Sequence, residues 1–147
     1  MNNNRSNEIF ERLKTYIPGG VNSPVRAFNS VDSNPIVMKS GHGSIIEDVD
    51  GNQYIDFVGS WGPLILGHSH HQIVQAVKSQ IDLGTHLSGS TDLEVTWAEW
   101  VRQLIPSAKK VRFHSSGTEA DMMAIRMARA YTGKSKVIKF QNHFGSV

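Results

Sequence analysis

The segment 110–140 constrains the fold of this 147-residue chain more than any other part. Apolar alternation predicts strands over 110–114 and 136–140, and a helical pattern occupies 118–131 between them. Gly133, directly after the helical pattern, is typical of a helix end. A strand, a helix and a second strand in this order favour a parallel α/β fold. Because only one such crossover is visible, we expect an incomplete α/β domain, and hence a fragment.

A polar junction separates the first of these strands from the helix, and it reads Ser115-Ser116-Gly117-Thr118-Glu119-Ala120. The unpaired N–H groups of a helix N-terminus suit a phosphate dianion. Gly117 would let the backbone approach such a group, and the hydroxyls of Ser116 and Thr118 could donate to it. The same residues also predict a capping box, in which Ser116 caps the helix and Glu119 reciprocates. The two interpretations are compatible, and the junction matches neither the dinucleotide fingerprint nor the P-loop.

The first half of the chain predicts a helix followed by a small antiparallel sheet. Residues 7–17 place apolar side chains on one helical face, and Pro18-Gly19-Gly20 ends that helix. Turn-forming residues fill the segment up to Asn34. Turn sequences then separate three short strands, which we expect over 36–39, 44–48 and 53–58.

Two further helices are expected between this sheet and the crossover. Ile73, Val77 and Ile81 mark the apolar face of the first. Thr91, with Glu94 three residues later, predicts a capping box that opens the second. The glycine-rich segment 59–71, ahead of both helices, predicts a loop.

Composition excludes several classes of function. The net charge is only +2 and the basic residues form no run, which argues against a nucleic-acid partner. The chain has no cysteine, and hence neither disulfides nor thiolate metal sites. Without a bilayer-length apolar stretch or a signal-peptide core, we expect a cytoplasmic protein that does not bind a membrane. We also expect no metal site, because the neighbouring histidines lie in a loop without an ordered carboxylate partner; they are His68, His70 and His71.

Three segments resemble known proteins. Residues 18–28 (PGGVNSPVRAF) and 60–68 (SWGPLILGH) are similar to N-terminal motifs of the glutamate-1-semialdehyde aminomutase family. Residues 111–140 resemble the phosphate-binding region of class III, fold-type-I aminotransferases. The likeness implies the N-terminal part of a fold-type-I transferase that depends on pyridoxal 5′-phosphate. Its small-domain segment of helix and β-meander would span 1–68, and 69–147 would begin the large cofactor-binding α/β domain.

The resemblance also implies roles for individual residues. The phosphate of pyridoxal 5′-phosphate or pyridoxamine 5′-phosphate would be held by Ser116, Gly117 and Thr118. Phe144 would stack on the pyridine ring, with His143 as the alternative because one residue of the family pattern is missing here. The substrate carboxylate would bind to Arg26, whose planar guanidinium matches it. The same pocket would be lined by Ser23 and Trp61.

The reaction implied for the full-length parent is intramolecular amino transfer, which converts glutamate 1-semialdehyde into 5-aminolevulinate for tetrapyrrole (porphyrin) biosynthesis. The parent would be a homodimer. Lys134, Lys136 and Lys139 match no Schiff-base motif. We therefore expect no catalytic residue in this chain and no activity from it alone.

Two alternatives to this reaction stay open. One is a class III transaminase acting on another amino acid or amine, which the segment 84–91 favours. The other is a non-catalytic remnant that binds a partner chain through exposed apolar surface on the helix of Trp97 and Trp100.

Overall fold

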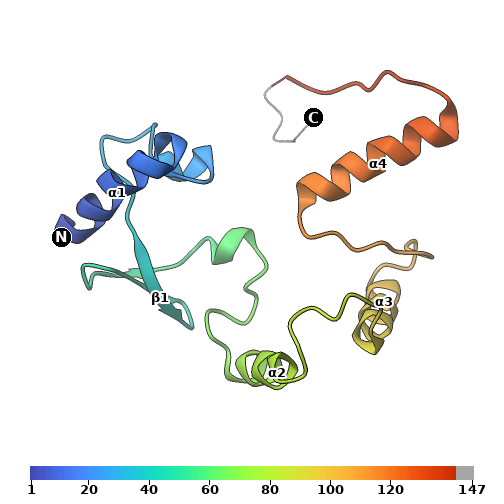
Figure 1. Cartoon of the computed structure of the whole chain (residues 1–147), viewed down its shortest axis with the longest axis horizontal. Helices are drawn as coiled ribbons and strands as arrows, with labels where there is room; N and C mark the ends of the chain where they lie inside the picture. Colours follow the sequence, from blue (N-terminus) through green and yellow to red (C-terminus); the bar gives the residue numbers. More distant parts are fainter. Residues whose placement is uncertain (142–147) are drawn as a thin grey trace. The chain divides into compact units, whose positions relative to one another are not determined.

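The structure is a computed structural model that describes residues 1–141 (Figure 1). The chain divides into two compact units, Met1–His86 and Leu87–Val147. The assignment of 1–68 to a small domain and of 69–147 to a large one stays a prediction.

The first unit contains two α-helices, three strands and three short 3-10 turns. Its longest element is the helix α1, which ends at Tyr16 because Pro18 and two glycines follow, as the sequence predicts. In chain order the elements are α1 (Asn4–Tyr16), η1 (Pro18–Gly20), η2 (Pro24–Ala27), β1 (Met38–His42), β2 (Ile45–Asp48), β3 (Gln53–Ile55), η3 (Gly59–Trp61) and α2 (His71–Ile81).

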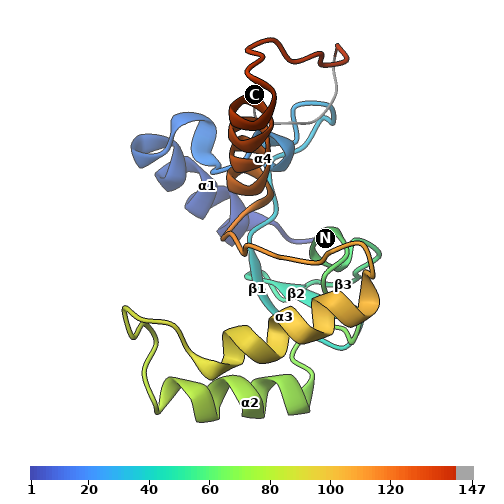
Figure 2. The same cartoon turned by 90° about the vertical axis from the view of Figure 1, so that its right-hand side faces the viewer.

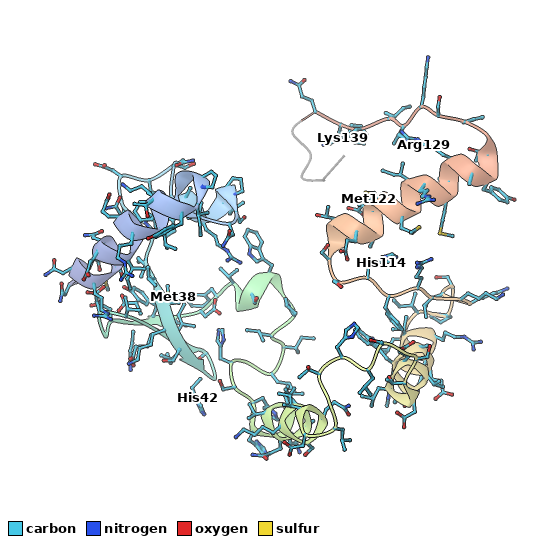
Figure 3. The ribbon with its side chains drawn as sticks, viewed as in Figure 1. Met38, His42, His114, Met122, Arg129 and Lys139 are labelled. Carbon is cyan, nitrogen blue, oxygen red and sulfur yellow. The ribbon has the colours of Figure 1, made fainter. Side chains whose placement is uncertain are left out.

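The three strands form an antiparallel meander in the order β1-β2-β3 (Figure 2). Met38 and His42 mark the two ends of β1 (Figure 3). His42 pairs with Ile45 across a tight turn, and Gly43 in that turn has a φ of +57°. This left-handed backbone favours glycine. The predicted meander is therefore confirmed.

The bounds of the strands differ from the prediction, and the second strand begins at Ile45, one residue later than expected. The first strand begins two residues later than Ile36 and continues through His42, because the turn uses Gly43 and Ser44. The third strand ends at Ile55 instead of Val58. The side chain of Asp56 accepts the N–H groups of Val58 and Gly59, which turns the backbone away from the sheet.

A buried polar cluster joins α1 to the β2–β3 turn. Asp48 is 0% exposed, and its carboxylate accepts hydrogen bonds from Tyr54 Oη (2.7 Å), from both the side chain and the N–H of Asn52 (2.7 and 2.8 Å), and from the N–H of Asp50 (2.9 Å). The Asp50 carboxylate in turn accepts the N–H groups of Arg5 (2.8 Å) and Ser6 (2.9 Å) and the Ser6 hydroxyl (2.7 Å). Asp50 therefore caps the N-terminus of α1 from another part of the chain.

The apolar part of this core is small. Among residues 1–141, Phe10 is the one large hydrophobic side chain that is buried. Its ring packs so close to Gly20 that a Cβ added there would lie 2.6 Å from Phe10 Cε2, and Gly20 also has a φ of +74°. Only glycine satisfies both conditions.

The second unit contains the helices α3 (Asp92–Leu104) and α4 (Gly117–Thr132). Glu94 Oε1 accepts the Thr91 N–H at 3.2 Å, so the predicted capping box is present. At its C-terminal end, α4 is terminated by Gly133 with a φ of +68°, as predicted. No helix of the described residues is long and apolar enough to cross a membrane.

The prediction of strands over 110–114 and 136–140 is wrong for this structure, and the parallel crossover is not formed. Neither segment has strand structure. A strand is stabilised by hydrogen bonds to a neighbouring strand, and the meander is the one sheet formed by the described residues. Apolar alternation indicates which face of a segment could be buried, but it does not show that a neighbouring strand is present to pair with it.

Candidate functional site: a helix N-terminus and two loops

The N-terminus of α4 is capped by Ser116 as the junction sequence predicts, but Glu119 does not complete the predicted capping box. Ser116 has an extended backbone, and its hydroxyl accepts the Glu119 N–H at 3.2 Å. The Ser116 carbonyl accepts the Ala120 N–H at 3.1 Å. Glu119 Oε2 accepts the N–H of Ser115 at 2.9 Å, one residue before the position that a capping box would use. The Ser116 cap is therefore confirmed, and Glu119 secures the chain just ahead of it.

This helix N-terminus is accessible. A Cβ added to Gly117 would meet no atom within 4 Å, and Ser116, Gly117 and Thr118 are all exposed. The positive end of a helix of 16 residues, an open glycine and two hydroxyls together fit a phosphate dianion. The binding of a cofactor phosphate at this position stays a prediction.

Arg26 and Ser23 share one short turn. Ser23 precedes the 3-10 turn η2, and its carbonyl accepts the Arg26 N–H at 2.9 Å. The Arg26 side chain is exposed, and it forms no ion pair with any carboxylate of residues 1–141. The guanidinium is therefore available to an anionic ligand.

Trp61 lies on an unusual loop after β3. Its side chain is 75% exposed. Four successive residues here have positive φ values, namely Gly59 (+54°), Ser60 (+55°), Trp61 (+67°) and Gly62 (+106°). Non-glycine residues rarely adopt this conformation, and it persists only where neighbouring contacts hold it.

The contacts at the base of this loop come from Asp56 and His68. Asp56 Oδ2 lies 2.6 Å from His68 Nε2, and its Oδ1 accepts the N–H groups of Val58 (2.8 Å) and Gly59 (3.0 Å). The hydrogen bond from His68, followed by those from Val58 and Gly59, lowers the pKa of Asp56 below its ordinary value. From the sequence, His68 was expected only not to bind a metal, and Asp56 was not predicted as its partner. The one local signal for this pair is Asp56 itself, because Asp is depleted in strands and lies here inside the predicted strand 53–58.

The predicted site residues belong to two different units of the structure. Ser116, Gly117 and Thr118 are adjacent in the second unit, whereas Ser23, Arg26 and Trp61 belong to the first. Within the described residues no hydrogen bond joins Trp61 to Ser23 or Arg26. His143 and Phe144, predicted to stack on a cofactor, lie outside the described residues.

The histidines form no metal centre in the described part of the chain. No group of three or more His, Asp or Glu side chains there is arranged to hold an ion. His68 is paired with Asp56, and the rings of His70 and His71 lie 4.9 Å apart and tilted.

The chain belongs to the class-III aminotransferase family, because the family model "Aminotransferase class-III" matches residues 27–146. Within that family it is similar to the glutamate-1-semialdehyde 2,1-aminomutase of Geotalea daltonii, with 56% identity over 140 residues. The alignment covers 95% of this chain and 33% of that protein. The chain thus spans about a third of the length of the curated relatives it matches.

Solved structures confirm the expected fold class. A structure described as "Transaminase with PLP bound" superposes with a TM-score of 0.82 at 38% identity, over 90% of this chain and 31% of that one. A glutamate-1-semialdehyde aminomutase from Pseudomonas aeruginosa superposes with a TM-score of 0.73, over 88% of this chain and 28% of that one. At 20% identity this second match supports the fold alone.

Proposed function

We propose that this chain is part of a cytoplasmic, homodimeric aminomutase that converts glutamate 1-semialdehyde into 5-aminolevulinate. The observation that carries the proposal is the 56% identity to an aminomutase over 95% of the chain. The cofactor would be pyridoxal 5′-phosphate or its pyridoxamine form, which supplies the electron sink for amino transfer. The 147 residues alone would be inactive, since no lysine among them matches the one that such enzymes use.

The phosphate of the cofactor would bind at the start of α4. The backbone around Gly117 is open, and the Ser116 and Thr118 hydroxyls lie next to it in sequence. Phosphate binding here needs no charged side chain, because the helix end itself attracts an anion. Phe144, or His143 in its place, would stack on the ring.

The substrate would be held through its carboxylate. Arg26 is exposed and has no carboxylate partner among residues 1–141, so it could form a two-pronged pair with the substrate. Ser23 and Trp61 would complete the pocket, Ser23 from the turn of Arg26 and Trp61 from the 59–62 loop.

The phosphate site can be tested on the 147-residue chain with Gly117→Ala. The added methyl group meets no atom of the protein within 4 Å, so the fold should be retained while the approach of a phosphate is blocked. Pyridoxamine 5′-phosphate is titrated while backbone amide signals are followed by NMR. We expect binding to weaken at least about tenfold, as for a lost hydrogen bond to a charged group.

Gly89→Ala is the matched control, because Gly89 lies in the same unit and an added Cβ there makes only an ordinary contact at 3.9 Å. Equal affinity in the parent chain, Gly117→Ala and Gly89→Ala would contradict the phosphate site.

A transaminase with another substrate is the second candidate. It is favoured by the structural match at 38% identity, which is to a transaminase. The two reactions differ in their requirements, since a transaminase needs an amino donor and a keto acceptor. The native protein, isolated with its cofactor and given glutamate 1-semialdehyde alone, should form 5-aminolevulinate. Turnover that requires both partners of a transamination would favour the second candidate.

A further inference from the structure

The loop 57–67 is attached to the β1–β2 hairpin at both of its ends. At one end the Asp56 N–H donates to the Ser44 carbonyl at 2.8 Å. At the other end His68 and Gly43 exchange two backbone hydrogen bonds, of 2.8 and 2.9 Å. The Asp56–His68 side-chain contact of 2.6 Å then joins the two ends to each other.

Close packing at these attachments requires glycine. A Cβ on Gly41 would lie 2.7 Å from His68 Cγ, so the imidazole rests directly on the strand backbone. A Cβ on Gly67 would lie 2.7 Å from the Gly43 carbonyl oxygen, and Gly67 has a φ of +76°. The His68 side chain is only 24% exposed and that of Asp56 only 10%. The pair is thus enclosed, and its geometry is fixed on several sides.

The loop held in this way contains a conformation that needs support. Ser60 and Trp61 both have left-handed backbones, which side chains with a Cβ disfavour. The Asp56 carboxylate bonds to the Gly59 N–H, at the first residue of the left-handed stretch. One carboxylate therefore connects the start of this stretch to the histidine at the far end of the loop.

We infer that Asp56 and His68 are positioning residues, which hold the loop 57–67 and thereby orient Trp61 for binding the substrate. The assignment of Trp61 to a substrate pocket rests on the proposed function. The clamp itself rests on the contacts around Asp56 and His68.

The test compares two replacements of His68 in the 147-residue chain. Glutamine places an amide nitrogen near the position of the imidazole Nε2, whereas asparagine is too short to reach Asp56 Oδ2. Amide exchange is measured at Gly43, whose N–H donates to the His68 carbonyl, and at Gly59, whose N–H donates to the Asp56 carboxylate. The N–H of Val49, bonded to the Val37 carbonyl at 2.9 Å, reports the sheet. Trp61 mobility is followed by fluorescence anisotropy in a Trp97→Phe/Trp100→Phe background.

With His68→Asn we expect about tenfold faster exchange at Gly43 and Gly59, as for a lost hydrogen bond to a charged group, and faster depolarisation of Trp61. Exchange at Val49 should not change. His68→Gln should restore slow exchange and low mobility. Asp56→Asn removes the charge and keeps an Oδ1 acceptor, so it should loosen the loop less than His68→Asn. His42→Asn, at an exposed histidine of the same hairpin, is the control and should have no effect (Figure 3).

The inference is overturned if His68→Asn and Asp56→Asn leave the loop unchanged, or if glutamine fails to rescue it. It is also overturned if both variants accelerate amide exchange at Val49 as well as in the loop, because the pair would then support the whole sheet. No ligand enters these measurements, so their failure would leave the phosphate site intact. Failure of phosphate binding at Gly117 would likewise leave the clamp intact.

Discussion

Asp48 and Asp50 show how two carboxylates can organise a segment that has little apolar core. Burial raises the pKa of Asp48, but the hydrogen bonds from Asn52, Tyr54 and Asp50 outweigh it, and the net pKa is below the ordinary value. The pKa of Asp50 is lowered in the same way, with the bonds from Arg5 and Ser6 opposing burial. The ionised forms of both carboxylates therefore stabilise the folded state.

The pH dependence of stability follows from these two shifts. A carboxylate whose folded pKa lies below the unfolded value of about 3.9 stabilises the fold above that pH, and the contribution disappears as the pH falls through the folded pKa. We expect the thermal midpoint of the first unit to be constant near neutral pH and to fall below about pH 4. Circular dichroism from pH 2 to 7 measures this.

Asp50→Ala separates this effect from general acid sensitivity. The variant should have a lower thermal midpoint than the parent chain at pH 7. Its midpoint should also fall by fewer degrees on acidification, because one of the titrating groups is gone. Asp32→Ala, at an exposed carboxylate in the same unit, should behave like the parent chain. A slope below pH 4 that is identical in the parent and in Asp50→Ala would contradict this account.

The three longer helices begin in different ways, although their N-termini have the same unpaired N–H groups. α1 is capped by Asp50 from the β2–β3 turn, α3 by the local pair of Thr91 and Glu94, and α4 by Ser116. The end of α4 is also secured, since Arg129 Nε donates to the Ser135 carbonyl at 2.8 Å (Figure 3). Only the α4 cap coincides with a proposed ligand site, so its two roles must be separated by substitution.

Replacements of Ser116 should separate helix capping from phosphate binding. Ser116→Ala removes the cap and should destabilise the first turn of α4 by about 1 kcal/mol, seen as roughly fivefold faster exchange of the Ala120 amide. Ser116→Asp keeps a capping oxygen and should preserve the helix, while its charge should repel pyridoxamine 5′-phosphate. Ser107→Ala is the control outside the helix. If Ser116→Asp binds the ligand as well as the parent chain does, Ser116 is a cap and nothing more.

What could be predicted from the sequence at this scale was the local part. The boundaries of α4 followed from Ser116 and Gly133, and the meander followed from the turns around Gly43 and Gly51, because neighbouring residues determine them. The prediction of strands at 110–114 and 136–140 was wrong because a strand depends on a partner strand elsewhere in the chain. The Asp50 cap of α1 and the Asp56–His68 clamp were missed for a similar reason, since each joins residues that are distant in sequence.

The molecule as a whole exposes much of its apolar surface. Among the described residues, α2, α3 and α4 contain no buried side chain. A cavity of about 540 Å³ lies between the 63–70 loop and α2. Its α2 wall includes Ile73 and Val77, each 53% exposed. Exposed apolar patches of this kind mark surfaces that another chain covers or that aggregate.

We therefore expect the 147-residue chain to bind the hydrophobic dye ANS and to self-associate with rising concentration. Val77→Lys should lower both dye fluorescence and the apparent mass on size exclusion, because it places a charge in the apolar row of α2. Gln75→Lys adds the same charge to the same helix outside that row and should change neither. If the chain stays monomeric and does not bind ANS, the expectation is contradicted. The alternative of a partner-binding remnant would then be weakened as well.

The cap that Asp50 provides for α1 also has a consequence for biosynthesis. A ribosome releases residues 4–6 before it has added residue 50, so the start of α1 emerges without its acceptor. This cap can form only after the β2–β3 turn has left the exit tunnel. The start of α1 must therefore wait for a segment that is translated later, and a pause in translation shortly before Asp50 would prolong the interval in which the nascent helix frays.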